Sequence, residues 1–275
     1  MFCYLCPICT ELLTLNSSAT SYQCQNQHCF DIAKDGYLNL LPVQHKGSKE
    51  PGDNKQMMTA RRAFLEAGFY APMAKAVAMM INANSPEHQA LTLLDIGCGE
   101  GYYSRNIAYH CPQNPPIALH GVDIAKFAIA AAAKKQPTAR FIVASSNRLP
   151  YPKQTFDWLL KVFAPANDDE LKRLLKPAGF LLTVTPGPRH LWQLKQFIYS
   201  DVREHALDAP LPVDFVSTDS LRLRYQITPD ADQRIALLQM TPFAWRANKS
   251  CQQTLKDAPA FSIDTDFILT LAIKS

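Results

Sequence analysis

Short apolar runs alternate with amphipathic segments along the middle of the chain. The apolar run 91–95 precedes an amphipathic segment at 101–110, and the run 117–122 precedes a second one at 124–135. Strands and helices that alternate at this spacing form a parallel sheet with helices on both faces. The pattern therefore predicts an α/β fold with a doubly wound, mostly parallel sheet, whose ligands bind beyond the carboxyl ends of the strands.

The alternation continues toward the C-terminus and changes in its final part. Further predicted elements are strand 140–144, strand 156–163, helix 168–175, strand 179–185 and helix 190–205. Alternating runs near 213–227 and 261–273, with a helical segment between them, predict two antiparallel strands that close one sheet edge. Between 57 and 81 apolar residues recur at helical spacing, and Gly68 and Pro72 divide them into two helices. We expect these two helices to lie over the ligand cleft.

A glycine-rich loop joins the first of these strands to its helix, with the sequence Asp95-Ile96-Gly97-Cys98-Gly99-Glu100-Gly101. Glycines let the backbone approach a ligand closely, and a helix that starts after them points free N–H groups at it. The spacing D-x-G-x-G-x-G differs from the G-x-G-x-x-G of dinucleotide-binding proteins, which favours S-adenosylmethionine over NAD. Asp95, Gly97 and Gly99 are thus candidate cofactor residues, and a tight turn without a ligand is the alternative.

An acidic residue ends the next strand, about two dozen residues after the loop. Asp123 follows the run 117–122, where a carboxylate can accept hydrogen bonds from both ribose hydroxyls of a nucleoside. Aspartate is also a favoured helix N-cap, so Asp123 taken alone fits either role. Combined with the glycine loop, it supports an adenosyl cofactor.

Five of the eight cysteines fall within the first 29 residues, as in a small metal-binding module. Cys6 and Cys9 form a two-residue knuckle, and Cys24 and His28 follow at the spacing of a zinc ribbon. Cys29 can replace His28 as the fourth ligand, and we favour His28. Four protein ligands leave no open position, so the predicted zinc is structural. Cys3 is a weaker candidate because it lies near the terminus.

The composition limits the number of domains and the kinds of partner that the sequence allows. The chain has 275 residues, 47% of them hydrophobic, which is enough for one full α/β domain and a small module. A net charge of +4 and a pI near 8.6 do not by themselves indicate a nucleic-acid partner. A basic strip lies between residues 45 and 62, comprising His45, Lys46, Lys49, Lys55, Arg61 and Arg62. No apolar run reaches the roughly 18–20 residues of a membrane helix, and we expect a cytoplasmic protein without a membrane partner.

The whole pattern resembles a known family. The specific segments are Phe30–Pro42, Arg61–Tyr70, Pro186–Leu191 and Leu238–Trp245. With the ribbon and the glycine loop, they make the chain similar over essentially its full length to the bacterial 23S rRNA (guanine-N1)-methyltransferases of the RlmA type. The resemblance implies a class I, Rossmann-like fold that transfers methyl from S-adenosylmethionine to N1 of a guanine in a 23S rRNA hairpin. It also implies a homodimer.

The resemblance further implies particular domains and residues. Residues 1–43 would be a zinc-binding, RNA-recognising domain, 44–57 a basic linker and 58–275 the methyltransferase domain. The family's cofactor contacts fall on Tyr70, Gly99, Glu100 and His190, and its zinc ligands on Cys6, Cys9, Cys24 and His28.

Other residues are expected on the substrate side of the site and around the adenine of the cofactor. Lys161–Pro165 follows the fourth strand and should face the methyl group, while Asn147 and Leu149 flank the adenine. Phe163 or Trp192 can stack on the guanine, although both are common core residues. The acceptor of the guanine N1 proton stays unassigned. A small-molecule methyltransferase, a dinucleotide-dependent reductase and a non-catalytic RNA-binding module are the competing hypotheses.

Overall fold

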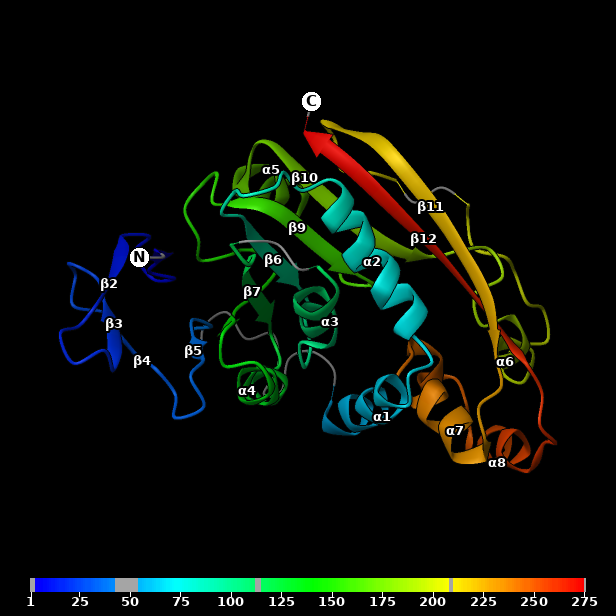
Figure 1. The fold of residues 1–275 in the computed structure, drawn as a ribbon. Coiled ribbons are helices and arrows are strands. Elements are labelled where there is room, and N and C mark those ends of the chain that lie inside the picture. The colour runs from blue at the N-terminus through cyan, green and yellow to red at the C-terminus, as the bar shows by residue number, and fades with distance from the viewer. Residues whose placement is uncertain (1–2, 43–53, 112–114, 208–209, 275) are drawn as a thin grey trace.

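An eight-stranded sheet organises the computed structural model of the chain (Figure 1). The structure describes residues 3–42, 54–111, 115–207 and 210–274. Within these ranges the strand order is β11-β12-β10-β9-β6-β7-β8-β5. The strands are β5 (Leu38–Asn39), β6 (Thr92–Ile96), β7 (Ala118–Asp123), β8 (Arg140–Val143), β9 (Phe156–Val162), β10 (Leu175–Pro186), β11 (Phe215–Ile227) and β12 (Ile263–Lys274).

The central strands run parallel, as the alternating pattern predicts. β9, β6, β7 and β8 pair in parallel, and β10 pairs in parallel with β9. β12 pairs antiparallel with both β10 and β11, so the C-terminal hairpin closes one edge. β6 lies between β7 and β9, so the chain reverses its winding direction at β6. Such a switch point opens a crevice beyond the carboxyl ends of the strands.

Helices cover both faces of this sheet. They are α1 (Lys55–Glu66), α2 (Ala71–Ala83), α3 (Tyr102–His110), α4 (Lys126–Lys135), α5 (Asp168–Leu174), α6 (Trp192–Gln196), α7 (Ala231–Gln239) and α8 (Lys249–Asp257), with a 3-10 turn, η2 (Pro242–Trp245). α1 packs against α7, and the two lie together below the sheet in Figure 1. Among the described residues no single helix is long and apolar enough to span a membrane. The α1–α2 pair meets that test only across an 80° bend.

The N-terminal module is a separate small sheet with the order β1-β2-β3-β4. Its strands are β1 (Tyr4–Leu5), β2 (Leu12–Leu15), β3 (Ser21–Gln23) and β4 (Cys29–Asp31). Its first strand contacts the main domain. The Leu5 N–H donates to the Pro150 carbonyl at 3.0 Å, and the Tyr4 ring lies 5.5 Å from that of Tyr151. β5, inside the range expected for the module, is an edge strand of the main sheet.

Two expected boundaries are wrong. The predicted linker 44–57 ends in helix, because Asn54 caps α1 by accepting a hydrogen bond from the Met57 N–H at 2.9 Å. Residues 43–53, with His45, Lys46 and Lys49, lie outside the described residues. The predicted helix 190–205 is reduced to α6, Trp192–Gln196. The His205 N–H donates to the Pro188 carbonyl instead of a carbonyl four residues earlier, so the segment folds back on itself.

Candidate functional site

The glycine loop bends sharply at the carboxyl end of β6. Gly97, Gly99 and Gly101 have φ values of +71°, +53° and +71°, which side chains with a Cβ rarely adopt. A Cβ on Gly97 would lie 2.5 Å from the Cβ of Ala164, in the loop that follows β9. The loops after β6 and β9 are therefore in contact, and only glycine at position 97 permits that contact.

Asp123 holds the loop in this shape. Its Oδ2 accepts a hydrogen bond from the Gly99 N–H at 2.9 Å, and its Oδ1 accepts one from the Ala125 N–H at 2.8 Å. Each carboxylate oxygen has a second lone pair, and Asp123 lines the cavity described below. Asp123 thus braces the turn and starts the segment that leads into α4.

Asp95 does not reach the cavity lining that the sequence suggested for it. Its side chain is buried beneath the loop and accepts a hydrogen bond from the Ser104 hydroxyl at 2.7 Å. Burial raises the pKa of Asp95 to about 7, against the lowering effect of that hydrogen bond. Asp95 ties the end of β6 to α3 and supports the loop from below.

Glu100 is held by two cations. Arg62 donates to both of its carboxylate oxygens, one of them at 2.7 Å from Nε, and the Lys135 Nζ lies at 3.2 Å. Burial by itself would raise the pKa of Glu100, but the hydrogen bonds and charges of Arg62 and Lys135 outweigh it and lower that pKa. The side chain therefore fastens α1 and α4 to the loop, and Gly99 and Glu100 both line the cavity.

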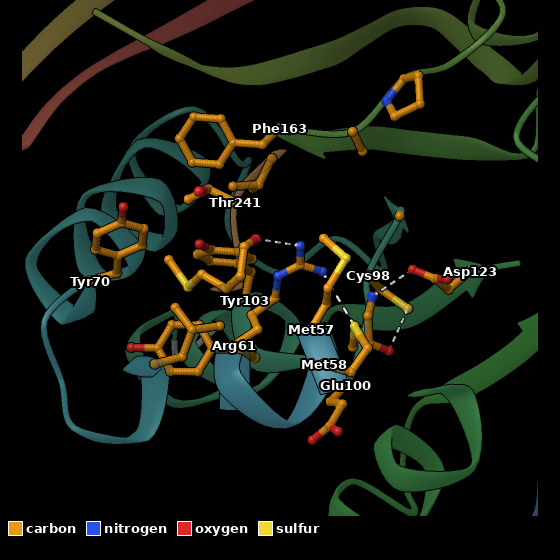
Figure 2. A pocket seen from close by; sticks show the side chains of 18 of the residues that line it. Met57, Met58, Arg61, Tyr70, Cys98, Glu100, Tyr103, Asp123, Phe163 and Thr241 are labelled. Carbon is orange, nitrogen blue, oxygen red and sulfur yellow. Dashed lines mark hydrogen bonds between the residues drawn. The ribbon is translucent and has the colours of Figure 1, made fainter. Parts of the chain in front are cut away.

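A cavity of about 860 Å³ occupies the switch point (Figure 2). Its size falls in the range of small-molecule and cofactor sites. The loops after β6, β7, β9 and β10 form its floor, and α1 and the segment from Met240 to Phe243 cover it. Figure 2 shows Arg61 in the middle of the cavity, between the sulfur atoms of Met57 and Met58 and the aromatic rings of Tyr70, Tyr103 and Phe163.

Tyr70 and His190 meet at one end of the cavity. The Tyr70 hydroxyl lies 3.4 Å from His190 Nε2, and both side chains are buried. The Phe163 ring stacks on His190 with centroids 5.7 Å apart, and Phe163 itself remains 44% exposed. This end of the cavity therefore has an aromatic wall that is open to the outside.

The remaining predicted residues divide into two groups. Asn147 lines the cavity. Leu149 lies outside the lining and is buried in the core, where its N–H donates to Glu170 Oε2 at 2.6 Å. Trp192 also lies off the cavity, under the Arg189 guanidinium at 4.6 Å. Of the two aromatic candidates for stacking, only Phe163 borders the site.

The metal ligands come together in the N-terminal module. The ligand atoms of Cys6, Cys9, Cys24 and His28 all lie within 4.8 Å of one another. The Cys9 and Cys24 sulfurs are 3.6 Å apart, and His28 Nδ1 lies 3.5 Å from the Cys6 sulfur and 3.4 Å from that of Cys24. A tetrahedron with Zn–S bonds of about 2.3 Å and a Zn–N bond of about 2.0 Å has edges of roughly 3.5–3.8 Å. The donor set fits zinc with His28, and the alternative ligand Cys29 is exposed.

Comparison with known proteins gives the family. A family model described as "RlmA, N-terminal" matches residues 4–49, and one described as "Methyltransferase domain" matches residues 93–179. The 23S rRNA (guanine(748)-N(1))-methyltransferase of Streptomyces fradiae is 32% identical over 87% of this chain and 85% of its own length. YxjB of Bacillus subtilis, provisionally named a 23S rRNA (guanine-N(1)-)-methyltransferase, is 30% identical over 98% of this chain and 97% of its own.

The chain belongs to the 23S rRNA (guanine-N1)-methyltransferase family. Among solved structures, the YcgJ protein from Bacillus subtilis aligns with a TM-score of 0.49 at 19% identity, over 74% of this chain and 98% of that one. As a member of this family the protein is an S-adenosylmethionine-dependent methyltransferase with a zinc-ribbon module.

The cavity fits the family's cofactor. A glycine loop that a Cβ would obstruct, and a carboxylate that lines the cavity at the next strand end, provide what an adenosyl group requires. The prediction of S-adenosylmethionine and structural zinc is confirmed.

Sequence reasoning missed several lining residues. Arg61 and Arg62 were assigned to a basic surface strip, yet both border the cavity. His205 lies in a segment expected to be helix, and no motif marked it. A helical plot of α1 could have placed Met58, Arg61, Arg62 and Leu65 along one side, because residues three and four apart share a helix face.

Proposed function

We propose that this protein transfers the methyl group of S-adenosylmethionine to N1 of a guanine in a hairpin of 23S rRNA. The observation that carries the proposal is the near full-length similarity to enzymes named for this reaction, combined with a single cavity that joins both sides of the site. The glycine loop and Asp123 form its donor end. Phe163 and Pro165, from the loop after β9, form its acceptor end, and His190, which contacts both Tyr70 and Phe163, lies where the two ends meet.

On the donor side we assign roles to residues that line the cavity. Asp123 accepts hydrogen bonds from the ribose hydroxyls, Gly99 allows close backbone approach, and Asn147 contacts the adenine. Tyr70 and His190 enclose the methionine end. Bound there, S-adenosylmethionine supplies an electrophilic methyl carbon, and the protein's task is to align the nucleophile with it and exclude water.

On the acceptor side the guanine must leave any base pair, because N1 lies on its Watson–Crick edge. Phe163 is a large, partly exposed aromatic side chain at the end of β9, and base stacking on such a side chain contributes about 1–3 kcal/mol. We assign it the stacking role. We also assign to residues 1–43 the recognition of the rRNA hairpin. We infer a cytoplasmic homodimer, and light scattering after size-exclusion chromatography tests the oligomeric state.

The test is product analysis. Transcripts of 23S rRNA hairpins are incubated with the protein and isotopically labelled S-adenosylmethionine, and nucleosides are then separated by mass spectrometry. We expect label in 1-methylguanosine and in no other nucleoside, with no reaction when every guanine in the hairpin is replaced by 1-methylguanine. Label in another nucleoside, or transfer to small molecules alone, would contradict the proposal.

A further inference from the structure

The methyl transfer leaves one chemical step without an assigned residue. Guanine N1 carries a proton, and this proton must be removed before or while N1 attacks the methyl carbon. The inference below rests on the proposed function, because it concerns the same site.

The carboxylates that line the cavity are occupied at the donor end. Glu100 is bound by Arg62 and Lys135, Glu66 also binds Lys135 at 2.7 Å, and Asp123 receives two backbone N–H groups. All three lie beside the glycine loop or on the helices fastened to it. In the described lining, this leaves the two histidines as the bases to consider.

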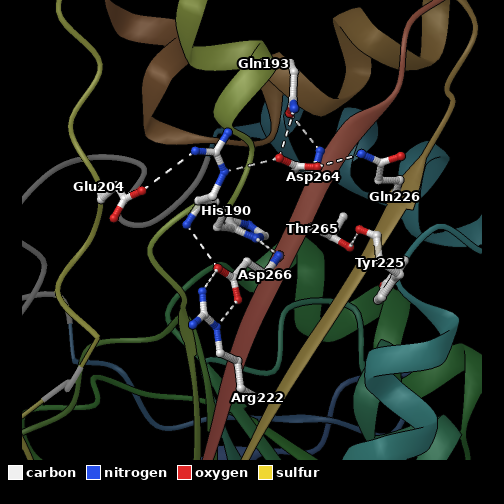
Figure 3. A network of polar contacts seen from close by, with 10 residues as sticks. His190, Gln193, Glu204, Arg222, Tyr225, Gln226, Asp264, Thr265 and Asp266 are labelled. Carbon is white, nitrogen blue, oxygen red and sulfur yellow. Dashed lines mark hydrogen bonds and ion pairs between the residues drawn. The ribbon is translucent and has the colours of Figure 1, made fainter.

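His190 is a donor and not a base. Its Nδ1 accepts a hydrogen bond from the Asp266 N–H at 3.3 Å, so Nε2, which faces Tyr70, carries the ring hydrogen. Burial lowers the pKa of His190 to about 3, with a smaller contribution from the charge of Lys195. Figure 3 shows His190 beside Asp266, whose two carboxylate oxygens accept hydrogen bonds from Arg222 at 2.9 and 2.8 Å.

His205 is placed differently. It lines the cavity and is only partly buried, and its backbone N–H is anchored on Pro188, two residues before His190. Its Nε2 lies 2.8 Å from the Nζ of Lys195, which projects from α6 and is only 4% exposed. The segment that replaces the predicted helix thus brings an imidazole and a buried amine into contact at the acceptor end.

We propose that His205, paired with Lys195, is the base that accepts the N1 proton of the target guanine. In the competent form Lys195 is a neutral amine that accepts a hydrogen bond from His205 Nε2–H, and Nδ1 carries a lone pair. The N1–H bond breaks as Nδ1–H forms, and the N1 electron pair forms the bond to the methyl carbon while the carbon–sulfur bond breaks. The Nε2 proton then passes to Lys195, which becomes an ammonium ion.

The charges around the pair agree with this role. Burial lowers the pKa of Lys195, which favours its neutral form. Burial also lowers the pKa of His205, the charge of Lys195 lowers it further, and Asp266 on β12 raises it. The other nearby titratable groups are His190 and the Arg189–Glu204 ion pair, at 3.8 Å, on the loops that flank the pair. The ring of Phe243 faces Lys195 at 5.7 Å.

The test compares single-turnover methylation rates between pH 6 and 9. We expect His205→Gln to lower the rate at pH 7.5 about 100-fold or more, the usual range for loss of a general base. The wild-type rate should rise with pH and level off once the pair is neutral, whereas the His205→Gln rate keeps rising because only water or hydroxide remains as acceptor. Lys195→Met should move the plateau to lower pH, since the imidazole then titrates alone.

Controls separate this inference from folding and from the proposed function. His110→Gln, at the end of α3 and outside the cavity lining, should leave the rate unchanged. S-adenosylmethionine affinity, measured by calorimetry, should change less than twofold in His205→Gln, which shows an intact cavity. A wild-type protein that makes no 1-methylguanosine would refute the proposed function. A wild type that makes it, with a His205→Gln rate within threefold and an unaltered pH profile, would overturn this inference alone.

Discussion

Replacing Gly97 with alanine should destabilise the protein through two separable effects. The residue has a φ of +71°, and its new Cβ would lie 2.5 Å from the Cβ of Ala164. The left-handed conformation costs an L-residue about 1–2 kcal/mol, and overpacking in a filled site costs about 1–3 kcal/mol. We therefore expect Gly97→Ala to lower the free energy of unfolding by about 2–5 kcal/mol.

A matched variant isolates the second effect. Gly68 has a similar φ of +84°, but a Cβ added there has no heavy atom within 4 Å. Gly68→Ala should therefore cost only the conformational part, about 1–2 kcal/mol. Urea unfolding followed by circular dichroism gives both values by linear extrapolation. The same preparations are titrated with S-adenosylmethionine, whose affinity should fall in Gly97→Ala and stay unchanged in Gly68→Ala.

A double-mutant cycle completes the test. Ala164→Gly removes the methyl group that the new Cβ meets. Adding Ala164→Gly to Gly97→Ala should therefore restore the part of the unfolding free energy that the clash costs, about 1–3 kcal/mol. Equal destabilisation in Gly97→Ala and Gly68→Ala, or the absence of any coupling with Ala164→Gly, would refute the contact between the two loops.

Three further predictions concern the loop supports and the ribbon. Burial raises the pKa of Asp95 to about 7, from about 3.9 in an unfolded chain. The native state therefore binds this proton more tightly than the unfolded state, and the free energy of unfolding falls as pH rises from about 4 to 7. The free energy of unfolding should therefore fall less between pH 5 and 8 in Asp95→Asn than in the wild type. Equal falls in the two proteins would count against this. Asp123→Ala removes the acceptor for two backbone N–H groups, and calorimetry should show at least a tenfold weaker S-adenosylmethionine affinity, since hydrogen bonds to charged groups contribute about 1.5–3 kcal/mol. His28→Ala should lose zinc in elemental analysis while Cys29→Ser keeps it, and the reverse result would make Cys29 the fourth ligand.

Local patterns were enough to predict the sheet and the donor end of the cavity. β6 is Thr92–Ile96 where the apolar run predicts 91–95, because a buried parallel strand is apolar on both faces. The glycine loop and Asp123 could be brought together for the same reason, since parallel strands end at one edge of the sheet. Both His28 and Cys29 have a feasible spacing from Cys24, His28 was preferred, and the ribbon geometry agrees with His28.

Contacts between distant segments could not be predicted in this way. Glu100 was expected to face the cofactor, but its carboxylate is bound by Arg62, 38 residues earlier. β5 has only two residues, too few for any periodicity. His205 lies in a segment whose backbone bonds to Pro188 instead of forming a helix, so neither its position nor its pairing with Lys195 follows from helical spacing.

Whether one cavity at the end of β6 binds the methyl donor can be decided by isothermal titration of the purified full-length protein. S-adenosylmethionine should bind with one site per chain, Asp123→Ala should weaken that binding at least tenfold, and NAD should give no heat. Absence of heat with S-adenosylmethionine, or binding of NAD with comparable affinity, would contradict the assignment of the glycine loop and everything built on it.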